Sequence, residues 1–394
     1  MMHDAEQYLL RVLRGFVQGE DPGPYSGGWQ QLIELSAMHS VTGILGHSVM
    51  SWPHDAAAET LQYLRRQCLQ TMAVFSRRAE AMHALTQQLS AEGIDHLLFK
   101  GYVVREYYTI PELRTFGDID FLIRPADRAK SDAWMKSQGF EPKENWEPVF
   151  SYIRGAEFYE IHSHVLETDI SERADYREYF SHVWDYAERK SAHTYVLKPE
   201  YHLLYLLTHI AKHIHGSGAG ARMYLDIAFF LRHFGDTLDW AWFRGELEKL
   251  NFYDFTNMVF TFVQREFGVE SPIPLRAVDE QTYRDFVDFT MAGGTFGKFG
   301  RDSAVIQLKN EDVGAEEVSR GKTLLRRFFP PASQIERRYT YLQGRHWLLP
   351  AAWVHRVFKN KDLIGQRMQE AQQIVTADTE EVLKLKRIYR EIGL

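Results

Sequence analysis

Two aspartates, Asp118 and Asp120, stand on either side of one isoleucine at the start of the apolar run GDIDFLI. Side chains alternate with a period of two along a strand, so both carboxylates are expected on the same face. Two negative charges this close repel each other, and a divalent cation between them is the usual reason for such a pair. A solvated strand end is the alternative for an isolated Asp-x-Asp, so the neighbouring segments decide.

A third carboxylate is available in the segment FYEIHSH, residues 158–164. If this segment is a strand, Glu160 and His162 share one face. If that strand lies beside the one carrying the two aspartates, Glu160 completes a group of three carboxylates, with Glu157 and Asp169 as its rivals. Such hard oxygen ligands suit Mg²⁺, with Mn²⁺ as the alternative.

Features suited to phosphate binding precede the aspartates. Lys100-Gly101 ends the short apolar run IDHLLFK and opens the segment YVVREYY, which is predicted to be a short helix. Glycine lets the backbone approach a ligand closely, and a helix N-terminus favours an anion. Lys100 then either contacts phosphate or reaches solvent from a strand end. Arg114 either joins this positive site or forms a salt bridge with a neighbour.

The elements around these residues change type along the chain. Residues 1–92 carry apolar side chains at three- and four-residue spacing, and the same spacing returns over 193–394. Between them, over 93–192, the apolar runs are short, and a hairpin is expected to turn at Gly155-Ala156. The sequence therefore predicts an α+β fold, with a small mixed-sheet domain between an N-terminal helical region and a C-terminal helical domain.

The second helical part contains further ionisable residues. His209 and His213 are four residues apart and share a helical face. The segment lacks the glutamate of a metalloprotease helix and any nearby cysteine, so packing is favoured over a zinc site, with a supporting role at a nucleotide pocket as a third possibility. Asp226 either faces the same site or pairs with Arg222, one turn away.

Taken together, LLFKG, ELRTFGDIDFLI and YEIHSH resemble the nucleotidyltransferase superfamily of DNA polymerase β type. More closely, they resemble an uncharacterised bacterial nucleotidyltransferase family, whose pattern is Leu-Lys-Gly, then Arg with Gly-Asp-Ile-Asp, then Glu-hydrophobic-His. The downstream HIAKHIHGSGAGARMYLDIAFFL is similar to the helical motif of that family. The resemblance implies Mg²⁺-dependent transfer of a nucleoside monophosphate from a nucleoside triphosphate to an acceptor hydroxyl, with release of pyrophosphate.

The resemblance also implies which residues act. The metal-binding and catalytic carboxylates would be Asp118, Asp120 and Glu160. The nucleotide and its phosphates would be bound by Lys100, Gly101, Arg114 and Gly117. Supporting residues would be His162, His209, His213 and Asp226. The superfamily's usual Gly-Ser turn is Lys100-Gly101 here, so Lys100 would replace the serine hydroxyl. A catalytically degenerate regulator that binds a nucleotide or a partner is the alternative, followed by an Asp-x-Asp glycosyltransferase.

Composition sets further limits. The chain has 394 residues and a formal net charge of -7, which argues against a protein that coats nucleic acid. The sequence has one cysteine, Cys68, so no disulfide within the chain is expected. No apolar stretch approaches the roughly 20 residues of a membrane-spanning helix, and the N-terminus lacks a signal-peptide core, so a cytoplasmic protein is expected. Residues 320–360 carry nine Lys or Arg against Glu336 alone, which indicates either contact with an anionic surface or a solvated face. A small molecule, a sugar, tRNA or a protein are all compatible acceptors.

Overall fold

A computed structural model describes most of the chain. The described residues are 4–115, 119–146, 149–166, 170–171, 173–216, 218–294, 308, 319–336, 339–342, 344–359 and 364–394. Three residues singled out in the sequence, Gly117, Asp118 and Asp169, lie outside this set.

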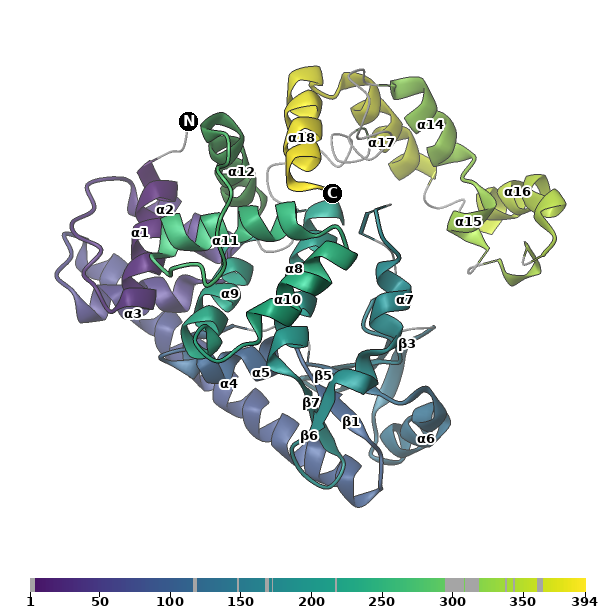
Figure 1. The fold of residues 1–394 in the computed structure, drawn as a ribbon, viewed down its shortest axis with the longest axis horizontal. Helices are drawn as coiled ribbons and strands as arrows, with labels where there is room; N and C mark the ends of the chain where they lie inside the picture. The colour runs from purple at the N-terminus through teal and green to yellow at the C-terminus, as the bar shows by residue number, and fades with distance from the viewer. Residues whose placement is uncertain are drawn as a thin grey trace.

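Helices occupy both ends of the chain. They are α1 (Asp4–Gln18), α2 (Trp29–Met38), α3 (Thr42–Ser51), α4 (Ala58–Ala91), α5 (Gly101–Val104), α6 (Arg128–Ser137), α7 (Tyr176–Ser181), α8 (Pro199–Gly216), α9 (Ala221–Phe234), α10 (Trp240–Lys249), α11 (Tyr253–Phe267), α12 (Glu280–Gly293), α14 (Arg320–Phe328), α15 (Ala332–Ile335), α16 (Leu349–Lys359), α17 (Ile364–Thr376) and α18 (Thr379–Ile392). The apolar positions of α1 form one buried stripe, which packs on α11 (Figure 1). Helices from the two ends of the chain therefore share one core.

Within the described residues, seven strands form one mixed sheet. They are β1 (His96–Leu98), β2 (Ile119–Ile123), β3 (Glu141–Trp146), β4 (Val149–Arg154), β5 (Glu157–His162), β6 (Ala187–Arg189) and β7 (Thr194–Leu197). The spatial order is β3-β4-β5-β2-β1-β7-β6. β2 runs parallel to β5 and β1 runs parallel to β7, whereas the other neighbours are antiparallel.

The two faces of the sheet pack against different helices. Alternation along β2 directs Ile119, Phe121 and Ile123 into a core shared with α4 and α6. Leu122 points to the opposite face and joins the larger core built with α8 and α9. Asp120 occurs two residues before Leu122 and therefore lies on this second face. The C-terminal helices thus cover the side of the sheet that carries Asp120.

Local details depart from the sequence expectation in two places. Proline favours the first turn of an α-helix, but Pro125–Asp127 form a 3-10 turn and α6 begins at Arg128. Strand β3 has a charged sequence without clear alternation, and it forms because it pairs with β4 at the edge of the sheet. Its register shifts between Pro142 and Glu144, consistent with the restriction of proline to edges and bulges.

The predicted fold class is confirmed: one mixed sheet is flanked by helical segments on both sides in sequence. The predicted hairpin is also confirmed, because Arg154 pairs with Glu157 across the Gly155-Ala156 turn. The division of the chain at residues 92 and 192 stays a prediction. Among the described helices, none combines the length and apolar composition needed to cross a membrane.

Candidate active site

Parallel pairing of β2 with β5 creates the centre of the site. In this register Asp120 is opposite Glu160, and Leu122 is opposite His162. The imidazole Nε2 of His162 lies 2.8 Å from Asp120 Oδ1 and 3.8 Å from Glu160 Oε2. Two strands that are distant in sequence therefore bring two carboxylates and one imidazole to the same face of the sheet.

A strained turn aims Lys100 at this group. Lys100 follows β1 and precedes α5 with φ 56° and ψ -142°, a backbone conformation that costs a non-glycine residue on the order of 1–3 kcal/mol. Its ammonium Nζ donates to Asp120 Oδ1 at 2.8 Å, with side chains 17% and 16% exposed. The ring of Phe99 lies 5.4 Å from Tyr205 of α8 and 5.8 Å from His162, which fixes the base of the turn.

The charges around Asp120 compensate one another. Burial by itself would raise the pKa of Asp120, but the Lys100 ammonium and the His162 N–H hold that pKa below its usual value. Burial likewise opposes the charge of Lys100, yet the Asp120 carboxylate raises the pKa of the ammonium. Asp120 is therefore an anion and Lys100 a cation at neutral pH.

The donor atoms fit a divalent cation. Among the described residues, Asp120, Glu160 and His162 are the group of at least three acidic or histidine side chains whose ligand atoms lie within 4.8 Å of one another. Two carboxylates at this separation suit a hard cation such as Mg²⁺. The carboxylate of Asp120 can only accept, so His162 Nε2 is the donor in their hydrogen bond. His162 is therefore better suited to orient Asp120 than to bind the metal.

A second buried cluster lies behind the Lys100 turn. The guanidinium of Arg114 forms a fork on Asp226, with Nε 3.1 Å from Oδ1 and Nη2 2.7 Å from Oδ2. The hydroxyl of Tyr108 donates to Asp226 Oδ1 at 2.7 Å. A Cβ added at Gly101 would meet Arg114 Nη1 at 2.0 Å, so only glycine allows this approach. Arg114 thereby connects the turn to α9.

Helices α8 and α9 contribute neutral imidazoles and one further cation. The rings of His209 and His213 are 4.6 Å apart. Burial and, after it, nearby positive charges including Lys100 lower the pKa of both imidazoles, that of His213 to about 4. Burial, followed by Arg114, lowers the pKa of Arg222 to about 10. The nearest carboxylate oxygen of Asp226 is 3.9 Å from Arg222, because Asp226 already binds Arg114.

The structure therefore divides the sequence-predicted residues into groups. Lys100, Asp120, Glu160 and His162 meet at one point, and Arg114 pairs with Asp226 beside them. His209 and His213 lie on α8 and, among the described residues, are not part of the ligand group of Asp120, Glu160 and His162. Gly117 and Asp118 lie outside the described residues.

Sequence reasoning missed Tyr108. Tyr108 directly follows the 3-10 turn Arg105–Tyr107 in extended backbone conformation, and no local pattern there predicts a contact with Asp226, which is 118 residues away.

Comparison with known proteins identifies one family. The family described as uncharacterised nucleotidyltransferase matches residues 25–268, a segment that contains every site residue discussed above. No curated protein and no solved structure matches the chain. Since the match covers more than half of the chain, the protein belongs to this uncharacterised nucleotidyltransferase family.

Proposed function

We propose that the protein is a metal-dependent enzyme that transfers a nucleoside monophosphate from a nucleoside triphosphate to an acceptor hydroxyl and releases pyrophosphate. The observation that carries this proposal is the pairing of Asp120 with Glu160 across β2 and β5. Lys100 at the same point supplies a positive charge where a triphosphate needs one. Family membership supports the same general chemistry.

Each residue has a distinct task in this proposal. The metal ion would be held by the carboxylates of Asp118, Asp120 and Glu160. Mg²⁺ is the ion that suits these ligands best. Lys100, which donates to Asp120 in this structure, would contact the phosphates once Asp120 holds the metal. His162 orients Asp120 through its Nε2–H. Arg114, already bound to Asp226, is a positioning residue for the Lys100-Gly101 turn.

The transfer balances as a single displacement. The acceptor hydroxyl gives its proton to Glu160, and its oxygen forms a bond to the α-phosphorus. The bond between the α-phosphorus and the oxygen that bridges to the β-phosphate breaks, and pyrophosphate leaves with the electron pair. When bound, a divalent cation neutralises charge that develops on the phosphate oxygens. Lys100 supplies positive charge at the same phosphates.

The second candidate is a nucleotide-binding regulator without catalysis. Its support is the direct ion pair between Lys100 and Asp120, which occupies two residues that catalysis needs. The two functions differ in one observable, because only the enzyme releases pyrophosphate.

Pyrophosphate release tests the proposal. The full chain is incubated with ATP, GTP, CTP or UTP, Mg²⁺ and a small-molecule cell extract as the source of acceptor. We expect release that depends on Mg²⁺ and on at least one of the four nucleotides. Glu160→Gln should lose at least about a hundredfold in rate, as expected for loss of a group used in general base catalysis.

A matched control uses the same strand. Glu157 lies on β5 but pairs with Arg154 at the hairpin end, so Glu157→Gln should retain wild-type activity. Binding of an ATP analogue without any pyrophosphate release would favour the regulator. Failure to bind any nucleotide in the presence of Mg²⁺ would refute both functions.

A further inference from the structure

A basic module near the C-terminal end of the chain has no task in the reaction steps above. It comprises the described residues between 319 and 359, and Figure 1 shows its helices α14, α15 and α16 at one edge of the molecule, with α17 between them and α18. The module follows the segment matched by the nucleotidyltransferase family, which ends at residue 268. Within the described residues it has a small core of its own, formed by Ile335, Tyr339, Leu342 and Ala352.

Helix α14 of this module exposes side chains that a helix packed on a protein normally buries. Leu325 is 61% exposed and Phe328 is 38% exposed, and because they are three residues apart they lie on one face of the helix. The buried side of α14 instead holds Thr323, and the helix packs on α17. A surface helix normally turns its apolar stripe toward the core. The outward apolar face of α14 therefore indicates a partner other than the described parts of the chain.

Further apolar side chains are exposed on α16 and on the turn before it. Trp347 is 77% exposed and Val354 is 57% exposed. Helix α16 adjoins the end of α14, because the rings of Phe329 and Trp353 are 5.2 Å apart. Nearly half of the large apolar side chains that are exposed among the described residues lie between 325 and 354. Such a concentration indicates an interaction surface, whereas single exposed apolar residues scattered over a protein are normal.

The same module carries a concentrated positive charge. Residues 320–360 contain nine Lys or Arg and one acid, Glu336, in a chain whose net charge is -7. Ion pairs within this segment can therefore neutralise one of the nine cations at most. Arg345, two residues before Trp347, is exposed and forms no ion pair within the described residues. Since the rest of the chain is strongly negative, an anionic surface attracts this module and repels the remainder.

We propose that the basic module binds the surface of a membrane that contains anionic lipids. Leu325, Phe328 and Trp347 enter the boundary between headgroups and acyl chains, and the cations of the module lie at the lipid phosphates. The aliphatic part of the surface favours lipid over nucleic acid, because Leu325 and Val354 offer neither a donor to a phosphate nor an aromatic face on which a base stacks. The inference goes beyond the proposed function and does not depend on it.

Vesicle binding by the full chain tests the proposal. Vesicles of phosphatidylcholine alone are compared with vesicles that also contain phosphatidylglycerol, and bound protein is separated by sedimentation. We expect at least tenfold tighter binding to the anionic vesicles, because one lysine or arginine near such a surface contributes about a factor of five. A higher salt concentration should weaken this binding, since salt screens the attraction.

The double variant Leu325→Ser/Phe328→Ser tests the apolar contact. It should weaken binding to anionic vesicles at least about tenfold, because these two side chains no longer transfer apolar surface from water into the lipid. Both side chains are exposed in the protein without lipid, so the melting temperature of the variant should stay close to that of the wild type.

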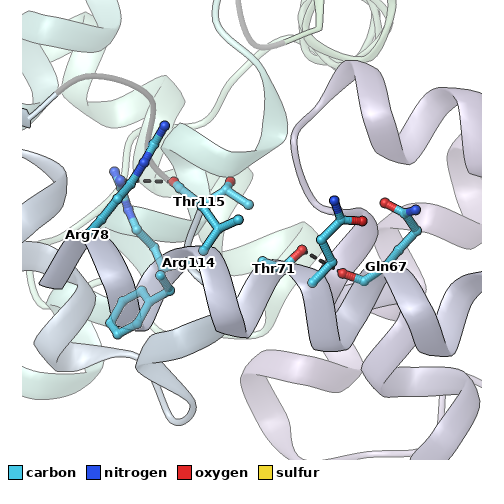
Figure 2. Close-up of a pocket in the computed structure, with 8 residues that line it drawn as sticks. Gln67, Thr71, Arg78, Arg114 and Thr115 are labelled. Atoms are coloured by element: carbon cyan, nitrogen blue, oxygen red, sulfur yellow. Dashed lines mark hydrogen bonds between the residues drawn. The ribbon is translucent and has the colours of Figure 1, made fainter. Parts of the chain in front are cut away.

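Helix α4 offers a matched control for the apolar variant. Figure 2 shows this helix where it carries Gln67 and Thr71, and Leu69 lies between them in sequence. Leu69 is 55% exposed and lines a surface depression with Arg65 and Arg66. It is thus an exposed leucine beside arginines outside the basic module, and Leu69→Ser should change vesicle binding by less than twofold.

The electrostatic contact is tested by a second matched pair. Arg345→Gln should weaken binding to anionic vesicles about fivefold, the contribution of one cation at such a surface. Arg77, an exposed arginine of α4, is the control, and Arg77→Gln should stay within twofold.

Trp347 reports whether the module enters the lipid. Phosphatidylcholine with brominated acyl chains, added to the anionic vesicles, quenches a tryptophan that reaches the bromines. The chain has nine tryptophans, so the signal of Trp347 is the difference between the wild type and Trp347→Phe. We expect this difference signal to be quenched, and an unquenched signal would contradict insertion.

Other results would also overturn the inference. Equal binding to the two kinds of vesicle would exclude recognition of anionic lipid, and equal losses in Leu69→Ser and the double variant would show only general adhesion. Binding of transfer RNA but not of vesicles, with a loss in Arg345→Gln, would assign the surface to nucleic acid. A dimer that the double variant dissociates in sedimentation velocity, without vesicle binding, would assign it to a second copy of the chain. None of these results changes the expected release of pyrophosphate, so the proposed function is tested separately.

Discussion

The buried pair between Arg114 and Asp226 can be tested by changing its charge without changing its shape. Asp226→Asn keeps an oxygen that accepts from Tyr108 but leaves the Arg114 guanidinium without its counterion. The two side chains are 5% and 8% exposed, so water does not replace the lost carboxylate. Removing one partner of a buried ion pair typically costs about 3–5 kcal/mol in the free energy of unfolding. Because one hydrogen bond to Tyr108 survives, we expect a loss of about 3 kcal/mol.

Urea denaturation followed by tryptophan fluorescence measures this loss. An exposed pair of equal length is the control: Arg265 Nη1 is 2.7 Å from Glu280 Oε1, with side chains 40% and 61% exposed. Glu280→Gln should cost less than about 1 kcal/mol, since water screens the pair. Equal losses in Asp226→Asn and Glu280→Gln would refute the reasoning, because they would mean that Asp226 does not hold Arg114. Pyrophosphate release by Asp226→Asn should also fall, since Arg114 supports the Lys100-Gly101 turn.

Three further predictions follow from described contacts. Burial lowers the pKa of His39 from 6.5 to about 4. The neutral imidazole therefore stabilises the fold fully above pH 6.5, and this stabilisation, about 3 kcal/mol in total, is lost as the pH falls toward 4. The Nδ1 atom of His39 accepts a hydrogen bond from the Ala221 N–H, so protonation of Nδ1 would break this bond. His39→Gln should therefore flatten the decline in the free energy of unfolding measured between pH 7 and 4. Gly101→Ala should displace Arg114 and lower both thermal stability and turnover, whereas unchanged turnover in a folded variant would contradict the positioning role. Lys100→Ala should raise the KM for the triphosphate more than it lowers the melting temperature, and unchanged kinetics would remove Lys100 from the site.

Local sequence patterns determined the elements that carry the site. Alternation in DIDFLI indicated that Asp118 and Asp120 share a face, and the structure shows that Asp120 lies opposite to the apolar side chains of Ile119 and Phe121. The turn residues Gly155-Ala156 predicted the hairpin correctly because turn chemistry depends on neighbouring residues alone. These inferences need no knowledge of distant segments.

Only the tertiary structure decided which charges meet. The parallel pairing of β2 with β5 sets Glu160 opposite Asp120, and no local pattern encodes which strands become neighbours. In the same way, the sequence left Arg114 between phosphate binding and a salt bridge, and the packing of α9 against the Lys100 turn resolved this in favour of Asp226. The physical reason is that burial decides the partner: a desolvated guanidinium needs the nearest carboxylate, and that carboxylate lies 112 residues further along the chain.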